Sequence, residues 1–286
     1  MNTREKVSNA WAMLWRRDRL SAIGLVLLAT LVLLGLFGPY LPLGDATKIA
    51  VGPRLTPPSW RFPFGTDELG RSFLPRVILG IRATFLLSAS AVLITSCVGA
   101  VLGMTAGYLR GATDQLIARG ADVLFAFPAL LIGLLIAAVL GPGNFSAIVV
   151  IAVATLPLFV RVIRSVTLGL AGRGFIVAAE VAGASSMRII RVHILPNVAG
   201  ALVVQLTYAL SVGMIIESVL SFLGLGVQPP GASLGSLLRQ GSAYLTFAPW
   251  LALSSGLVLS SAIMSVNLVG DAIRDVLEPL HGRPLT

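Results

Sequence analysis

Long apolar segments alternate with shorter polar ones along almost the whole chain. A helix that crosses about 30 Å of hydrocarbon needs about 20 mostly apolar residues, because each residue of an α-helix advances about 1.5 Å. Segments of about this length lie at residues 20–41, 83–109, 123–140, 146–166, 198–225 and 245–269. The pattern therefore predicts an all-α integral membrane protein with six transmembrane helices.

The polar stretches divide the chain further. The apolar run that follows the basic N-terminal tail is longer than the roughly 7 to 15 residues typical of a secretory signal, and no A-x-A site follows it, so we expect a retained anchor. The next stretch is rich in proline, which disfavours regular helix and predicts a loop. The expected parts are a tail at 1–19, the first span at 20–41, a loop at 42–82, a five-helix core at 83–278 and a C-terminal tail at 279–286.

The composition agrees with a membrane protein. Hydrophobic residues make up 56% of the chain and charged residues 12%, against about 25% charged in soluble domains, and the mean hydropathy is +0.91. The net charge of +9 comes from basic residues scattered between apolar runs, which argues against nucleic acid and favours contact with the lipid bilayer. A single cysteine, Cys97, and two distant histidines, His193 and His281, provide no disulfide framework and predict no metal site.

The distribution of basic residues predicts the orientation. With a cytoplasmic N-terminus, fourteen of the 21 Lys and Arg residues fall on the cytoplasmic side of the six spans and seven on the other side. Cytoplasmic loops carry an excess of positive charge, so both termini are expected to be cytoplasmic. The loop at 42–82 is then extracytoplasmic, and the stretch between the fourth and fifth spans is cytoplasmic.

That cytoplasmic stretch, FIVAAEVAGASSMRIIRVHILPN at residues 175–197, gathers charges that are rare elsewhere in the chain. Its first part favours helix up to Gly183, where a residue that tolerates positive φ suits a tight turn. In its second part Met187, Ile190 and Ile194 recur at helical spacing, which predicts a short amphipathic helix.

Two further features complete this stretch. Arg188 and Arg191 are three residues apart, on a face next to the apolar one. Pro196 disfavours helix at the preceding residue and is expected to mark the entry to the fifth span. On pattern alone, the segment is either a rigid cytoplasmic projection or an interfacial helix that rests on lipid headgroups.

The same stretch resembles the cytoplasmic loop of the permease subunits of binding-protein-dependent ABC importers, whose usual pattern is Glu-Ala-Ala, three residues, Gly, nine residues, Ile-x-Leu-Pro. The matching residues are Ala178, Ala179, Gly183, Leu195 and Pro196. Val177 occupies the position of the usual glutamate, and Glu180 lies three residues further on. Ile194 directly precedes the closing pair, a shift that is common among peptide-type members.

Four other segments resemble the C-type permeases of dipeptide and oligopeptide (peptide/nickel) importers. They are PFGTDELGRSFLPRVILGIR, GYLRGATDQLIARGADVLFAFPALL, ESVLSFLGLGVQPP and APWLALSSGLVLSSAIMSVNLVGDAIRDVLEP. With six spans in the right order, the chain is identified as a member of that family. The resemblance implies the type I ABC importer permease fold and a multi-pass location in a bacterial or archaeal cytoplasmic (inner) membrane.

The resemblance also implies partners. Family members pair with a homologous second permease, two cytoplasmic ATPase subunits and an extracytoplasmic substrate-binding protein. The only lysines in this chain are Lys6 and Lys48, and neither lies in a phosphate-binding loop pattern, so the chain is expected to be a non-catalytic transport subunit without a cofactor. ATP and Mg are expected in the partner ATPase subunits.

By the same resemblance, residues 170–196 form a coupling loop that seats in a groove of the ATPase. Met187 and Ile190 are then expected to supply buried contact, and Arg188 and Arg191 charge complementarity at the rim. The alternative for these four residues is contact with lipid headgroups.

Other candidate residues are isolated. Glu217 lies within the fifth span, where an ionisable side chain is costly, and it is either part of a pathway or gate or a hydrogen-bonded glutamate that packs helices together. Asp67, Glu68 and Arg71, in GTDELGR, are candidates for contact with the binding protein or the second permease. A self-contained turn held by local hydrogen bonds is the alternative.

Near the end of the last span, Asn267 and Asp271 either line a pathway or, as we favour, mark the membrane interface. The sequence as a whole favours a permease for short peptides in an ATP-driven importer, with a nickel chelate or another small solute as the alternative cargo. An ion-driven secondary transporter usually shows paired intramembrane charges and internal repeats, and neither is evident. A membrane enzyme would need a clustered catalytic set, which two isolated histidines do not provide.

Overall fold

The computed structural model describes residues 19–277. This part of the chain consists of helices and loops, without a strand, and its extended backbone pairs only at an isolated bridge between Thr66 and Ser72. The predicted tail at 279–286 lies outside the described residues. Of the predicted tail at 1–19, only Arg19 is described.

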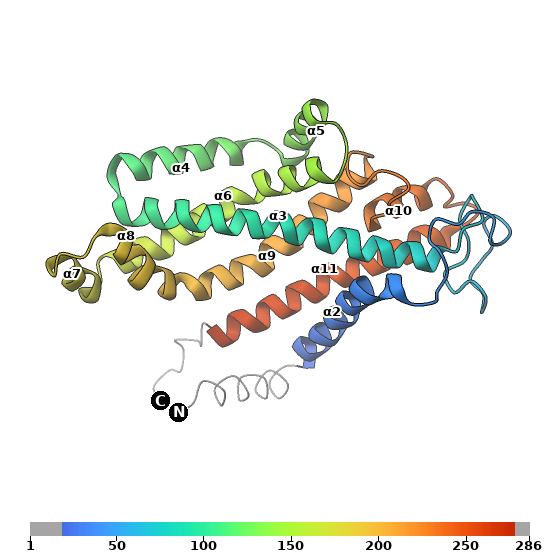
Figure 1. Cartoon of the computed structure of the whole chain (residues 1–286), viewed down its shortest axis with the longest axis horizontal. Coiled ribbons are helices and arrows are strands. Elements are labelled where there is room, and N and C mark those ends of the chain that lie inside the picture. Colours follow the sequence, from blue (N-terminus) through green and yellow to red (C-terminus); the bar gives the residue numbers. More distant parts are fainter. Residues whose placement is uncertain (1–18, 278–286) are drawn as a thin grey trace.

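The helices form a long bundle. In chain order the elements are α2 (Arg19–Phe37), the 3-10 turn η1 (Gly38–Tyr40), α3 (Phe73–Leu109), α4 (Gly111–Ala126), α5 (Ala129–Leu140), α6 (Asn144–Ala171), α7 (Gly174–Val181), α8 (Ser186–Arg188), the π turn η2 (Ile189–Ile194), α9 (Leu195–Phe222), α10 (Leu234–Ser242) and α11 (Pro249–Leu277). Figure 1 shows α3, α6, α9 and α11 running along the long axis of the bundle. The helices α7 and α8 lie at one end, and α10 lies with the loop before α3 at the other.

The number of candidate spans agrees with the prediction when one bent pair of helices is counted as a single span. Among the described residues, five helices are long and apolar enough to cross a membrane, and α4 with α5 makes a sixth span if the bent pair is taken as one. The third span is not the straight helix that was expected at 123–140, because α4 begins at Gly111 and its axis meets that of α5 at 89°. Pro128 causes the break, since it has no N–H and holds Phe127 in an extended conformation.

A stripe of glycines lets α3 and α6 approach closely. Gly99, Gly103 and Gly107 follow one another at intervals of four residues on α3. A Cβ atom on each would lie within 2.4 to 2.8 Å of a Cβ atom on α6. Small residues at this spacing are how membrane helices gain van der Waals contact without a hydrophobic driving force. The stripe therefore fixes the pair of helices around which the bundle is built.

Two predicted boundaries were wrong. The helix α3 begins at Phe73, so residues 73–82 of the predicted loop are helical. The prolines that predicted a loop end at Pro63, apart from Pro75 in the first turn of α3, and Arg76 in this turn is buried in an ionic network. With 37 residues, α3 is about 55 Å long and exceeds the thickness of the hydrocarbon core.

The expected break before the fifth span is also absent. Residues 186–222 form one continuous helix, in which the N–H of Leu195 bonds to the carbonyl of Ile190, five residues earlier. The π turn directly before Pro196 accommodates its missing N–H inside this continuous helix. The short helix α10 was not predicted; Ser233 caps its N-terminus through a reciprocal capping box with Ser236.

Candidate functional site

A sharp turn at Gly183 separates α7 from α8. Its φ of +80° confirms the predicted positive value. The N–H of Ala184 bonds to the carbonyl of Ala179 at 3.0 Å and that of Gly183 to the carbonyl of Glu180 at 2.9 Å, which is the Schellman pattern at a helix C-terminus. No other atom lies within 4 Å of where a Cβ on Gly183 would be. Glycine is therefore required here by the backbone conformation and not by lack of space.

Isoleucine side chains attach this segment to the rest of the chain. Ile176, Ile189, Ile190 and Ile194 are buried and pack in one cluster with side chains of α3 and α6. The structure thereby corrects the role expected for Ile190, which belongs to the core of its own chain. The π turn η2 changes the angular spacing of successive side chains, so Met187 does not share the buried face of Ile190 and is 58% exposed.

The remaining side chains of the segment face outward. We call the following set the α7–α8 surface: Phe175, Val177, Val181, Met187, Arg188 and Arg191, all exposed. Of the other predicted loop residues, Ala178, Glu180, Leu195 and Pro196 are exposed and Ala179 is half-buried. Exposed apolar side chains rimmed by arginines are typical of a protein interaction surface.

Tyr108, which the sequence did not single out, ties the end of α3 to α7. Its hydroxyl donates a hydrogen bond to Oε1 of Glu180 at 2.9 Å, and its ring packs against the isoleucine cluster. Glu180 stands three residues from the family's usual glutamate position, and its own chain provides its partner. The two residues are 72 positions apart in sequence, so no local pattern could have joined them.

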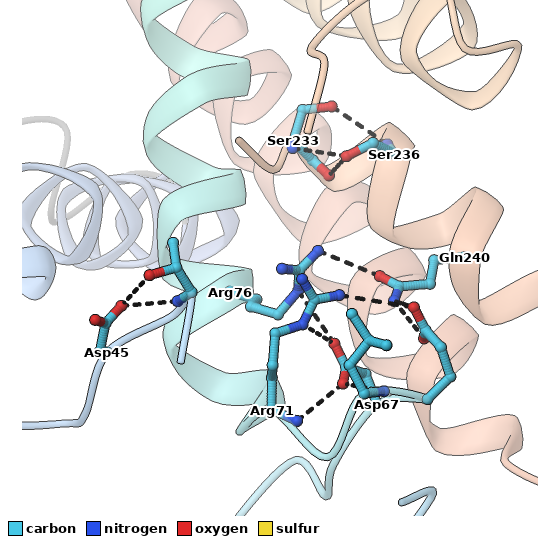
Figure 2. A network of polar contacts seen from close by, with 10 residues as sticks. Asp45, Asp67, Arg71, Arg76, Ser233, Ser236 and Gln240 are labelled. Atoms are coloured by element: carbon cyan, nitrogen blue, oxygen red, sulfur yellow. Dashed lines mark hydrogen bonds and ion pairs between the residues drawn. The ribbon is translucent and has the colours of Figure 1, made fainter. Parts of the chain in front are cut away.

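At the other end of the bundle, Asp67 is the centre of a buried ionic network (Figure 2). Its carboxylate accepts hydrogen bonds from the backbone N–H groups of Leu69 and Arg71, each at 2.9 Å. It also pairs with Nε of Arg71 at 2.6 Å and lies 3.6 Å from Nε of Arg76. Of the two interpretations of Asp67, the structure favours the self-contained turn over contact with another protein, because the side chain is fully buried and accepts these local hydrogen bonds.

Gln240 of α10 extends the network. Its side-chain amide donates to the carboxylate of Glu68, and its carbonyl oxygen accepts a hydrogen bond from Nη2 of Arg76 at 3.4 Å. Arg71 lies 3.6 Å from the same glutamate, and both side chains remain partly exposed. The network thereby joins the loop and the adjoining start of α3 to α10, which is distant from both in sequence.

Glu217 of α9 lies in a cluster of hydroxyl groups. The hydroxyl of Ser221 donates to Oε1 at 2.7 Å, and that of Ser218 lies 3.5 Å from Oε2. Thr84 of α3 and Ser233, at the start of α10, also interact with the carboxyl group. Glu217 is fully buried within a single chain. Its burial favours the interpretation as a hydrogen-bonded glutamate that packs helices over the interpretation as part of a gate.

A cleft of about 320 Å³ lies between α6, α9 and α11, and we call it the α9–α11 cleft. Its polar lining residues are Gln205, Thr207, Tyr208, Asn267, Asp271 and Arg274. Asn267 and Asp271 therefore face a common cavity, although the sequence favoured a role at the membrane interface. Oδ1 of Asn267 accepts a hydrogen bond from the hydroxyl of Ser211 at 2.5 Å. Among residues 19–277, no group of three or more His, Cys, Asp or Glu side chains is placed to hold a metal ion.

Comparison with known proteins gives consistent results. Residues 99–281 match the model of the family described as binding-protein-dependent transport system inner membrane component. The di/tripeptide transport system permease protein DppC of Pseudomonas aeruginosa is 37% identical over 90% of this chain and 86% of its own length. The dipeptide transport system permease protein DppC of Haemophilus influenzae is 33% identical over 93% and 92%, and the glutathione transport system permease protein GsiD of Escherichia coli is 36% identical over 96% and 92%.

A solved structure has the same fold. A chain of the methionine ABC transporter MetNI in an inward-facing conformation superposes with a TM-score of 0.61, covering 71% of this chain and 97% of the other, at 18% identity. This likeness confirms the predicted type I ABC importer permease fold. The helices, the match over residues 99–281 and the relatives agree, and the chain belongs to the family of binding-protein-dependent transport permeases of the inner membrane.

Proposed function

We propose that this permease moves short peptides across the inner membrane, together with a homologous second permease, two ATPase subunits and an extracytoplasmic binding protein. The names of the relatives support a peptide cargo, since they specify di- and tripeptides, dipeptides and glutathione, which is itself a tripeptide. The alternative cargo is a nickel chelate or another small solute. ATP and Mg belong to the ATPase subunits in this proposal, because the chain has no phosphate-binding loop.

The α7–α8 surface is the observation that carries the ATPase part of the proposal. Met187 and Val181 are exposed beside Arg188 and Arg191, while the isoleucines of the same segment are packed against α3 and α6. A packed interior is barely compressible, so a displacement of the surface moves the helices to which it is attached. An ATPase that closes on ATP can therefore transmit its movement to the spans through this segment.

Reconstitution tests the proposed function. The chain is purified with its second permease and ATPase subunits, placed in proteoliposomes and supplied with binding protein and a labelled dipeptide. We expect uptake that requires ATP. Uptake driven by a proton or sodium gradient through this chain alone would contradict the proposal.

The α7–α8 surface has its own test in the same preparation. Met187→Asp is expected to lower retention of the ATPase subunits by about tenfold or more, because burying an unpaired charge in an interface costs more than 1.4 kcal/mol. Met187→Leu, which keeps an apolar side chain of similar size, is the control and should retain them. Equal retention for the two variants would contradict ATPase docking at this surface.

Cysteine labelling tests the proposed orientation. In a Cys97→Ser background, cysteines at Ser59 and Ser242 are expected to react with an impermeant thiol reagent from outside. Ser59 belongs to the loop before α3 and Ser242 ends α10, and these two segments lie at the same end of the bundle. A cysteine at Ser185, beside the turn at Gly183, should react only after permeabilisation. Reaction of Ser185→Cys from outside would place the α7–α8 surface away from the ATPases.

A further inference from the structure

We propose that the α9–α11 cleft is a binding subsite for the backbone and charged termini of a short peptide. This inference rests on the proposed peptide transport and adds the place in this chain where the peptide is held. The cleft volume of about 320 Å³ lies at the lower end of the range of small-molecule sites, which is about 300 to 1,000 Å³.

Gln205 is the strongest indication of a ligand. It lies within the span formed by α9, only 8% of it is exposed, and it lines the cleft. Within residues 19–277, its side-chain amide forms no hydrogen bond to another residue, and the amide is open to the cleft. An amide has both a donor and an acceptor, so a ligand in the cleft that supplies both can satisfy it. A peptide bond supplies both.

The neighbouring polar groups extend this match. Oδ1 of Asn267 is engaged by Ser211, so its NH₂ group is the part of the amide that is oriented to donate to a ligand carbonyl. Asp271 and Arg274 lie one helical turn apart on α11 and provide one negative and one positive charge. Arg274 also interacts within the chain. Because a guanidinium has five N–H donors, it can keep that interaction and bind a ligand carboxylate at the same time.

The combination selects the class of ligand. Two amides recognise a peptide bond, a carboxylate recognises an ammonium group, and a guanidinium recognises a terminal carboxylate. A peptide with free termini carries all three groups within a short distance. An acyl chain would leave these polar groups unpaired, and a helix from the second permease would have to supply complementary polar groups of its own. We therefore infer a zwitterionic di- or tripeptide.

Protection of a cysteine from labelling tests the inference in the assembled transporter. Ala201→Cys, in a Cys97→Ser background, places a thiol in the wall of the cleft, and Ala199→Cys places one on the exposed part of the same helix, outside the cleft. The rate of maleimide labelling is measured with and without a dipeptide. The same preparation is assayed for ATP-driven uptake, so that a failure of the proposed function is seen separately.

We expect the dipeptide to slow labelling at Ala201→Cys and not at Ala199→Cys. The N-acetylated dipeptide amide, which lacks both charges, should protect poorly. Adding Gln205→Leu to Ala201→Cys should raise the protecting concentration by about tenfold, the effect of about one lost hydrogen bond to a buried amide. Equal protection by the blocked peptide, or none in a transporter that imports dipeptide, would overturn the inference. Labelling blocked before peptide is added would instead show that the second permease or a lipid fills the cleft.

Discussion

Gly183→Val is expected to abolish solute uptake while the chain still reaches the membrane at normal abundance. A β-branched residue at φ +80° is strained by about 1 to 3 kcal/mol, and no neighbouring atom crowds the position, so the whole effect comes from the backbone. The turn would open and redirect α8, which carries Met187 and Arg188. The chain should still bind the second permease, because the packing of the spans does not involve this residue.

Gly183→Asn is the matched control, because asparagine tolerates the left-handed conformation far better than valine. Membrane abundance, retention of the ATPase subunits and hydrolysis stimulated by the loaded binding protein are measured for both variants. We expect near-normal values for Gly183→Asn in all three measurements. If Gly183→Val also stimulates hydrolysis and supports uptake normally, the turn does not transmit ATP closure.

Asp67→Ala is expected to destabilise strongly the end of the bundle that carries α10. The change leaves Arg71 and Arg76 without the carboxylate that both contact, and Arg76 is buried. Removing one partner of a buried ion pair costs about 3 to 5 kcal/mol, because an uncompensated charge remains in the interior. The free energy of unfolding, measured with denaturant in detergent solution, should fall by about that amount.

Glu68→Gln provides the comparison within the same network. The glutamate side chain is 28% exposed, and glutamine keeps an oxygen that can accept from Gln240. The expected loss is about 1 kcal/mol or less, as for partly exposed ion pairs. Equal losses for Asp67→Ala and Glu68→Gln would mean that Asp67 is not the centre of the network.

The two ends of the bundle also differ in how far the sequence could predict them. The turn at Gly183 depends on the conformation of one residue and its neighbours, so a local pattern was sufficient to find it. Asp67 pairs with Arg76, which in turn donates a hydrogen bond to Gln240 of α10, far along the chain. The sequence contained each of these residues but no signal of their contact.

The sequence by itself determined the membrane class, the number of spans, the family and the turn between α7 and α8. Each of these follows from the length of apolar runs, from short motifs or from the backbone preference of a single residue, all of which are local properties. The tertiary structure decided which side chains are buried within the chain and which are exposed to a ligand or another protein. Ile190 is buried because the π turn alters its angular position, and Asn267 and Asp271 meet Gln205 in one cleft because α9 packs beside α11. These outcomes depend on contacts between helices that are distant in sequence, and the periodicity of a single helix does not contain them.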